Sequence, residues 1–185
     1  MIVLLAACGE QGPKFRSTDI TGAPYGKALT LTDHHGKPRT LADFRGKAVV
    51  LFFGFTQCPD VCPTTLADAA EAIKALGPAA DRVQVLFVTL DPERDTQAVL
   101  AAYVNAFDPR FVALYGDLEA TRTAAKEFKV FFEKRPGDTP GTYSVDHSAQ
   151  TYLLDPAGRL RLFVRHGRLR EDLAPDLRVL LAESR

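Results

Sequence analysis

The chain has 185 residues, of which 46% are hydrophobic and 25% charged, and its 23 Lys and Arg residues balance 23 Asp and Glu residues. This length suits one domain with a hydrophobic core, and a neutral chain without a basic cluster excludes nucleic acid as a predicted partner. The cysteines are Cys8, Cys58 and Cys62. They are too few for a disulfide-stapled scaffold, so the close pair predicts a functional role.

Residues 1–8 are predicted to be the remnant of a lipoprotein signal. They are apolar and end in small residues, as in the last part of a secretory signal. The run Leu5-Ala6-Ala7-Cys8 resembles the lipobox of bacterial lipoproteins, in which the cysteine is lipidated. It predicts lipidation of Cys8 and a lipid-anchored domain in the bacterial cell envelope, outside the cytoplasm. The stretch lacks a basic region and is too short to span a bilayer, and the alternative is an apolar start with a stray cysteine.

Residues 9–27 are rich in Gly, Pro and polar side chains and are predicted to be a linker, which leaves residues 28–185 as the domain. Residues 28–32 and 39–41 flank an exposed turn at His34-His35-Gly36-Lys37, which predicts a hairpin. Residues 48–55 are almost wholly apolar, as expected of a central strand covered on both faces.

The rest of the chain alternates helical and strand patterns. We predict helices at 63–76, at the segment with Val99 on its apolar face, at 118–128 and at 169–182, and strands at 83–90, 111–115, 151–155 and 160–165. Residues 135–141 are a loop or hairpin inserted before the strand at about 149–155. The fold class is therefore α/β, a thioredoxin-like mixed sheet flanked by helices.

The segment from residue 56 to residue 63, called here the cysteine loop, places Cys58 and Cys62 between the first central strand and its helix. Pro63 suits the first helical position, so Cys62 is predicted to be the cap residue. Both metal binding and disulfide formation are open to two thiols in such a loop. The partial positive charge of a helix N-terminus favours the thiolate form, which performs both reactions.

Two thiolates select soft ions, copper(I) or zinc. A closed zinc site needs four protein ligands, whereas copper(I) accepts two sulfurs and one imidazole. His147 is the candidate third ligand, because it follows the inserted loop and precedes the strand at 151–155. Asp146 either orients this imidazole or caps a turn. His34, His35 and His166 are not expected to be ligands.

Asp91 and Asp95 have two interpretations, and Asp60 is a third carboxylate near the thiols. Asp91 ends the strand at 83–90 and either flanks the site or, like Asp95, serves helix capping with a favourable dipole interaction. Asp95 is interpreted as a capping residue of the helix that contains Val99. Asp60 lies within the cysteine loop, where an exposed carboxylate would suit a cationic partner surface.

These motifs together resemble the Sco/SenC family of copper chaperones. The resemblance is carried by the run from Phe52 to Pro63, by Val88-Thr89-Leu90-Asp91-Pro92-Glu93-Arg94-Asp95 and by Val145-Asp146-His147-Ser148. It implies a thioredoxin-like fold, copper held by Cys58, Cys62 and His147, and assembly of the binuclear copper A centre of cytochrome c oxidase subunit II. It also implies other periplasmic copper carriers or thiol reductants as partners.

Three functions compete. The first is a metallochaperone that carries copper(I) on Cys58, Cys62 and His147. The second is a thiol–disulfide reductase that uses Cys58 and Cys62 on the cysteines of the same oxidase subunit without metal. His147 discriminates between them, because a pure reductase does not need it. The third is a thiol peroxidase of related fold, for which the sequence offers no Arg and hydroxyl motif beside an activated cysteine.

Overall fold

The computed structural model describes residues 14–183, so the predicted signal remnant and Cys8 lie outside the described residues. In the described part of the chain, eight strands form one mixed sheet in the order β1-β10-β9-β4-β5-β6-β2-β3. The strands are β1 (Thr18–Asp19), β2 (Thr30–Asp33), β3 (Pro38–Thr40), β4 (Ala48–Gly54), β5 (Val83–Thr89), β6 (Val112–Tyr115), β9 (Thr151–Leu154) and β10 (Leu160–Val164). The central strands β4, β5 and β6 run parallel, and every other pairing is antiparallel.

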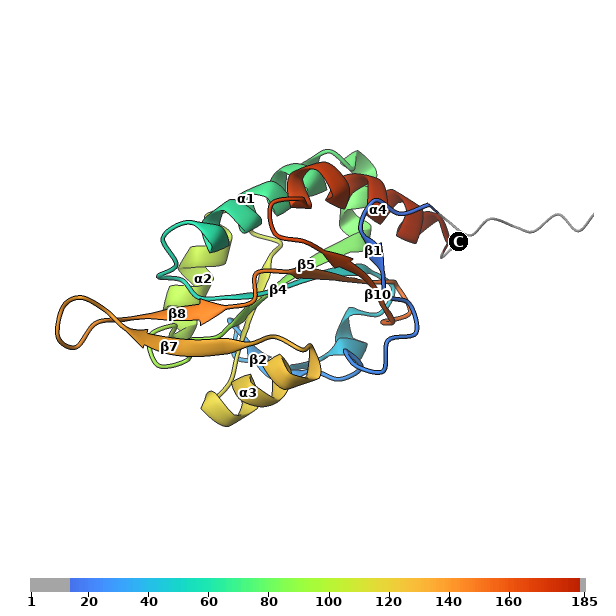
Figure 1. Ribbon diagram of the computed structural model, residues 1–185. Helices are drawn as coiled ribbons and strands as arrows, with labels where there is room; N and C mark the ends of the chain where they lie inside the picture. Colours follow the sequence, from blue (N-terminus) through green and yellow to red (C-terminus); the bar gives the residue numbers. More distant parts are fainter. Residues whose placement is uncertain (1–13, 184–185) are drawn as a thin grey trace, which may run out of the picture.

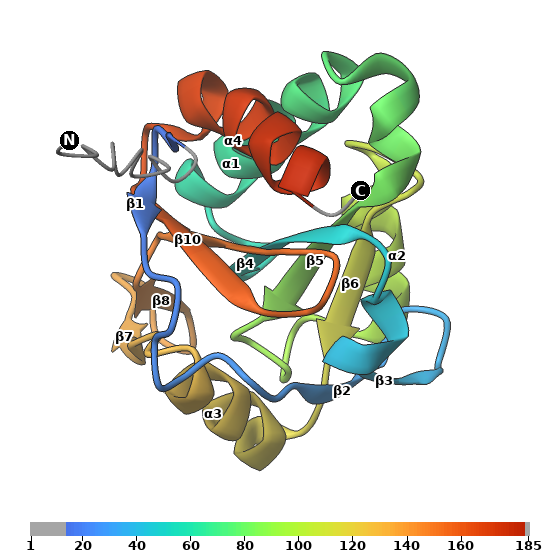
Figure 2. The ribbon, with the colours of Figure 1, turned by 90° about the vertical axis from the view of Figure 1, so that its right-hand side faces the viewer.

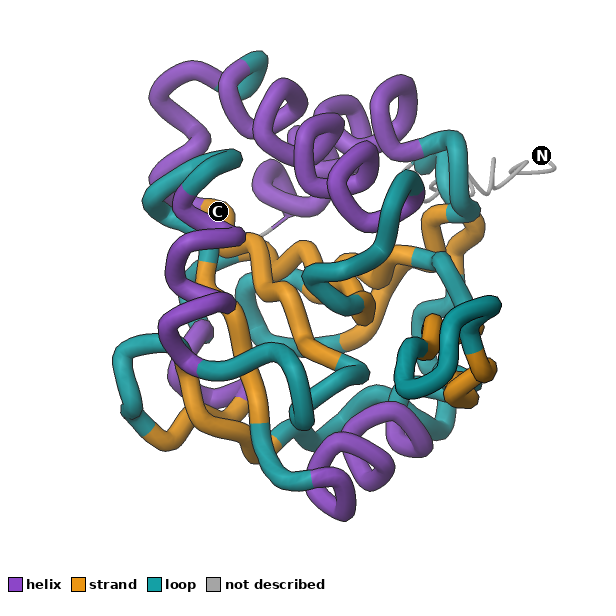
Figure 3. The backbone as a smooth tube through the Cα atoms, turned by 90° about the vertical axis from the view of Figure 1, so that its left-hand side faces the viewer, coloured by secondary structure: helices purple, strands orange, loops and turns teal. Residues whose placement is uncertain are grey.

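Helices cover both faces of this sheet. The helices α1 (Val61–Lys74) and α4 (Leu169–Glu183) pack together on one face, and α3 (Leu118–Glu127) lies on the other (Figure 1). The helix α2 (Gln97–Asn105) contacts β6, and short 3-10 helices lie at Leu41–Phe44 and Gly77–Arg82. A view turned by 90° from that of Figure 1 shows the strands between these helical layers (Figure 3). The predicted α/β class and the predicted strand and helix order therefore match the structure.

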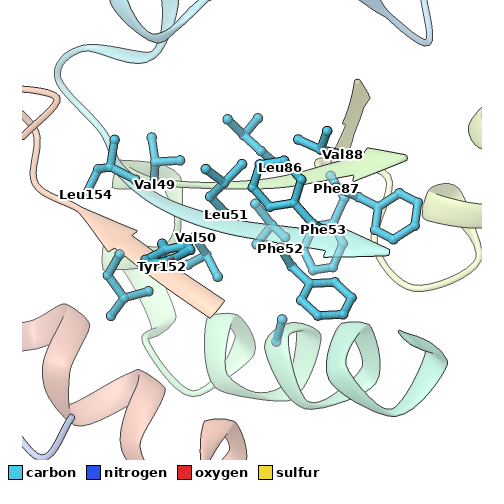
Figure 4. Packing of buried hydrophobic residues seen from close by; sticks show 14 of the residues in the cluster. Val49, Val50, Leu51, Phe52, Phe53, Leu86, Phe87, Val88, Tyr152 and Leu154 are labelled. Carbon is cyan, nitrogen blue, oxygen red and sulfur yellow. The ribbon is translucent and has the colours of Figure 1, made fainter. Parts of the chain in front are cut away.

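The core lies around β4 and β5. All seven residues of β4 are buried, and the strand pairs in parallel register with β5 from Ala48 opposite Val83 to Gly54 opposite Thr89. Figure 4 shows the aliphatic and aromatic side chains that β4, β5 and β9 contribute to both sides of the sheet. Burial on both faces explains why the β4 sequence is continuously apolar and lacks the alternation of a half-exposed strand. Gly54, at the end of β4, is buried with the rest of the strand.

A second sheet consists of two strands only. The strands β7 (Phe132–Pro136) and β8 (Tyr143–His147) pair antiparallel, with Phe132 opposite His147, and form what we call the ribbon. The ribbon is not paired with the main sheet and projects beyond it (Figure 1). The predicted insertion is thus a hairpin, and His147 is its last residue.

Part of the predicted linker is structured. Within residues 14–27, β1 pairs with β10 at the edge of the main sheet (Figure 2), and the backbone N–H groups of Arg16 and Ser17 donate to the carboxylate of Asp176. Phe15 and Ile20 pack against the core. The linker expectation is wrong for these residues, because a Gly- and Pro-rich composition does not reveal a pairing with a strand as distant in sequence as β10, where Phe163 lies opposite Thr18.

Two local expectations also need correction. Val99, predicted on the apolar face of α2, is 41% exposed, and Leu100 and Val104 are the buried residues of that helix. His34, predicted in an exposed turn, is buried, and its Nδ1 accepts a hydrogen bond from the Ala113 N–H at 3.0 Å. In both cases a neighbouring strand decided which side chain is covered, and neither periodicity nor turn composition encodes that neighbour.

Candidate metal centre

The site begins where β4 ends. Gly54 is the last residue of β4, and the chain then passes through the cysteine loop into α1. A Cβ atom at Gly54 would lie 2.6 Å from the Cys62 Sγ and 3.0 Å from the rings of Phe52 and Phe87. A side chain at this position would therefore displace the sulfur. Because glycine has no side chain, Cys62 can pack directly against the end of β4.

The helix α1 starts earlier than predicted. Its N-cap is Asp60, so Cys62 is the second residue of the helix and does not cap it. Pro63 is the third residue, where a missing N–H costs nothing because first-turn N–H groups have no partner within the helix. The Cys62 N–H points at the Cys58 Sγ, 3.4 Å away. The sulfur of Cys58 thus takes the place that a capping oxygen occupies in other helices.

The two thiols have unequal surroundings. Cys62 is fully buried, whereas Cys58 is partly exposed, and both are free cysteines. Burial raises the pKa of the Cys62 thiol well above its ordinary value. Burial therefore opposes the predicted stabilisation of the Cys62 thiolate by the helix N-terminus.

The ribbon brings His147 to the two sulfurs. The His147 Nε2 lies 3.6 Å from the Cys62 Sγ, and the ligand atoms of Cys58, Cys62 and His147 all lie within 4.8 Å of one another. The three residues come from a loop, a helix and a strand that are up to 89 positions apart in the sequence. The structure therefore assembles two sulfurs and one nitrogen into a group that can hold a metal ion.

The imidazole of His147 has the tautomer and the orientation that a metal ligand needs. Its Nδ1 lies 2.9 Å from the Ser148 carbonyl oxygen, which can only accept, so Nδ1 carries the proton and Nε2 presents its lone pair to the sulfurs. Burial lowers the pKa of His147, which favours the neutral ring. The rings of Phe52 and Phe55 stand edge-on to it at 6.2 and 5.8 Å between centroids. These contacts leave the ring little freedom to turn.

Asp146 has neither of its predicted roles. Its exposed carboxylate accepts a hydrogen bond from Arg135 Nε at 2.9 Å, across the ribbon and away from the His147 ring. Adjacent residues of a strand point to opposite faces, so a carboxylate beside His147 in sequence cannot contact its ring. The backbone carbonyl of Ser148 orients the ring in its place.

Asp95 secures the cysteine loop. Its buried carboxylate accepts hydrogen bonds from the Thr56 N–H at 3.1 Å, the Thr56 hydroxyl at 2.5 Å and the Thr89 hydroxyl at 2.6 Å. Thr96, and not Asp95, caps α2 by accepting from the Val99 N–H. The capping interpretation is therefore wrong. Sequence reasoning missed Thr56 and Thr89 in this network. Asp95 is 39 residues from Thr56 and 6 residues from Thr89, and no local pattern indicates either contact.

Two predicted carboxylates remain, Asp60 and Asp91, and each has defined contacts. Asp60 is exposed at the start of α1, with its Oδ1 3.5 Å from the Thr64 hydroxyl. Asp91 is fully buried and pairs with Arg94 and with the Tyr143 hydroxyl, the latter at 2.8 Å. Asp91 therefore joins the loop after β5 to the first residue of β8. Tyr143 was not found by sequence reasoning, since nothing in its local pattern indicates a contact with the loop that follows β5.

A family model described as SCO1/SenC matches residues 17–182. The chain belongs to the SCO1/SenC family. Among curated relatives, a mitochondrial SCO2 homolog of Bos taurus is 40% identical over 159 residues, which are 85% of this chain and 60% of the relative. The chain thus spans about 60% of the length of that relative.

Solved structures support the same fold. The apo Sco1 protein from Thermus thermophilus is 43% identical with a TM-score of 0.81, over 91% of this chain and 98% of that one. The copper-bound ScoI of Bradyrhizobium japonicum is 39% identical with a TM-score of 0.76, and the match covers 83% of this chain and 98% of that one. The predicted Sco/SenC membership and thioredoxin-like fold are confirmed. Within residues 14–183, no helix combines the length and apolar character needed to cross a bilayer.

Proposed function

We propose that this protein is a copper(I) metallochaperone that holds copper through Cys58, Cys62 and His147. The observation that carries the proposal is the mutual approach of their ligand atoms, all within 4.8 Å of one another. Two sulfurs and one imidazole suit a soft ion that accepts low coordination. The neutral tautomer of His147 presents the correct nitrogen. The likeness to copper-bound ScoI of Bradyrhizobium japonicum supports the choice of copper.

The unequal exposure of the two cysteines suits release of the metal to a partner. Cys62 is fully buried and His147 is half-buried, whereas Cys58 is partly exposed in the loop. An incoming thiolate reaches the ion on the Cys58 side and replaces that sulfur first. Exchange of one ligand at a time transfers the ion without exposing it to water.

The proposed recipient is the binuclear copper A site of cytochrome c oxidase subunit II, and copper carriers or thiol reductants of the periplasm are proposed as further partners. The family resemblance supports this assignment. We also propose that Cys8 carries a lipid and holds the domain in the bacterial cell envelope. Mass analysis of protein extracted from native membranes tests this anchor. An unmodified Met1 terminus would contradict it.

Copper binding is tested by titrating the reduced full-length protein with copper(I) in competition with a chelator. Wild type should bind about one equivalent, and His147→Ala should weaken binding by at least about tenfold. Asp146→Ala is the matched control, because its side chain pairs with Arg135 on the outside of the ribbon and should leave the affinity unchanged. Equal affinities of wild type and His147→Ala would remove the three-ligand site.

Delivery is tested separately with the copper-loaded protein and the metal-free, reduced copper A domain of subunit II. The spectrum of the recipient should change as copper leaves Cys58, Cys62 and His147. Loaded protein that retains its copper in the presence of this domain would rule out subunit II as the recipient. Copper binding itself would stand in that case, because the titration measures it independently.

A second function is a thiol–disulfide reductase, which the free and closely spaced sulfurs of Cys58 and Cys62 favour. In this reaction the two thiols give two electrons and two protons to a disulfide of the oxidase subunit. The target disulfide becomes two thiols, and Cys58 and Cys62 become a disulfide. The test is reduction of an oxidised subunit II peptide by the metal-free dithiol. An unchanged peptide disulfide would refute this function.

A further inference from the structure

The ribbon that carries His147 has little backbone support. Its strands β7 and β8 pair only with each other, and an isolated pair of strands is at best marginally stable. At the His147 end, the Ser148 N–H donates to the Phe131 carbonyl at 3.0 Å, and the Phe131 N–H donates to the Ser148 hydroxyl at 3.1 Å. Both of these contacts join the two arms of the ribbon. The contacts that fix the ribbon against the cysteine loop must therefore lie elsewhere.

A cluster of side chains at Tyr143, the first residue of β8, provides such contacts. The Tyr143 hydroxyl donates to the buried carboxylate of Asp91 at 2.8 Å. The Arg94 guanidinium lies over the Tyr143 ring at 3.6 Å from its centroid, and the Lys134 ammonium lies 4.5 Å from the same centroid. Lys134 also pairs with Glu93 at 2.5 Å. The ribbon is thus bound to the loop after β5 by ionic, cation–π and hydrogen-bond contacts.

Arg94 is the centre of this cluster, because it contacts three segments. Its Nε donates to the Asp91 carboxylate on its own loop. Its Nη1 donates to the Tyr143 carbonyl at 2.9 Å on the ribbon and to Gln57 Oε1 at 3.0 Å in the cysteine loop, one residue before Cys58. A planar guanidinium makes these contacts in fixed directions, which a lysine cannot reproduce.

We infer that Arg94 is a positioning residue that holds the ribbon against the cysteine loop and so keeps His147 within ligand distance of the two sulfurs. The inference rests on the proposed copper function. Tyr143 lies four residues before His147 in the same strand, about 13 Å along it at the usual rise of a strand. A strand fixed at Tyr143 by Arg94 and closed by Ser148 beyond His147 has its histidine held from both sides. Loss of Arg94 releases the ribbon from the cysteine loop at the Tyr143 end.

The test compares copper(I) affinity in four full-length proteins: wild type, Arg94→Met, His147→Ala and the double variant. Arg94→Met keeps much of the aliphatic side chain and removes the guanidinium. It should weaken copper(I) binding by about tenfold, the size of effect found when a group that supports a ligand is removed. In the His147→Ala background the same change should have almost no further effect, because the group that Arg94 positions is gone.

Two control variants accompany the cycle. Arg94→Lys should recover little of the affinity, because it keeps the charge but loses the fork that joins Gln57 to Tyr143. Arg110→Gln removes a comparable Arg–Asp pair, with Asp108 at 2.6 Å, just before β6, whereas the cysteine loop follows the end of the parallel strand β4. It should leave copper binding unchanged. Full recovery with Arg94→Lys would overturn the inference, because charge alone would then suffice.

Amide hydrogen exchange of the metal-free proteins gives a readout independent of copper. Arg94→Met should speed exchange at the cross-ribbon N–H groups of 132–148 and leave exchange in β4 and β5 unchanged. Unchanged ribbon exchange, an unchanged copper affinity, or an equal loss of affinity in the His147→Ala background would each overturn the inference. If wild type bound no copper(I), the proposed function would fail, and the exchange data alone would then decide whether Arg94 holds the ribbon.

Discussion

Gly54 and Cys62 are packed so closely that a single added carbon would collide with the sulfur, at 2.6 Å from its centre. This contact fixes the inner thiol against the end of β4. Gly54→Ala should therefore destabilise the protein by about 1–3 kcal/mol, the usual cost of overpacking a core. Urea unfolding of the two metal-free proteins measures the difference.

A double-mutant cycle isolates the contact. In a Cys62→Ala background, Gly54→Ala should cost less free energy of unfolding, because the sulfur no longer occupies the space. The rings of Phe52 and Phe87 still limit the room, so part of the cost should remain. A cost that is the same in both backgrounds would show that Gly54 acts through these rings alone.

The two cysteines should react at different rates. Cys62 is fully buried and burial raises its pKa, whereas Cys58 is partly exposed. Alkylation requires an accessible thiolate, so iodoacetamide should modify Cys58 first in the reduced, metal-free protein. Mass mapping after short reaction times identifies the modified residue. Preferential labelling of Cys62 would contradict the arrangement of the loop.

Asp95 should contribute to stability through the cysteine loop. Asp95→Ala leaves the Thr56 and Thr89 hydroxyls and the Thr56 N–H without their acceptor. An unsatisfied buried donor costs about 1–3 kcal/mol, so the variant should unfold at clearly lower urea. Asp95→Asn keeps one acceptor oxygen and should lower the free energy of unfolding by a smaller amount. A loss no larger for Asp95→Ala than for Asp95→Asn would argue against the network.

His34 should make the stability depend on pH. Burial lowers its pKa from 6.5, so the unfolded state binds more protons than the folded state below that value. The contribution of His34 to the free energy of unfolding is therefore fully present above about pH 6.5 and is lost as the pH falls toward the pKa of the folded state. His34→Gln should reduce the difference in free energy of unfolding between about pH 7.5 and about pH 5.

The neighbouring His35 provides the matched control for this measurement. Its side chain is exposed, and it makes no buried hydrogen bond like the one between His34 Nδ1 and the Ala113 N–H. His35→Gln should change the pH dependence much less than His34→Gln. Equal effects of the two substitutions would mean that burial of His34 does not cause the pH dependence of stability.

Much of the fold was predictable because its signals are local. The continuous apolar run of β4 indicates a strand covered on both faces, and the apolar spacing after Pro63 indicates a helix. Some boundaries differ from the predicted ones: α1 begins at Val61, and residues 14–27 include a strand. These differences arise where contacts with distant strands, and not propensity, decide the local structure.

The sequence alone determined the family, the order of strands and helices and the three candidate ligands, because motifs and periodicity are written in neighbouring residues. Only the tertiary structure decided the surroundings of those ligands. It buried Cys62 and left Cys58 accessible, turned Asp146 away from His147, and placed Asp95 and Arg94 around the cysteine loop. Hydration, ring orientation and hydrogen bonding depend on groups that are adjacent only after the chain has folded.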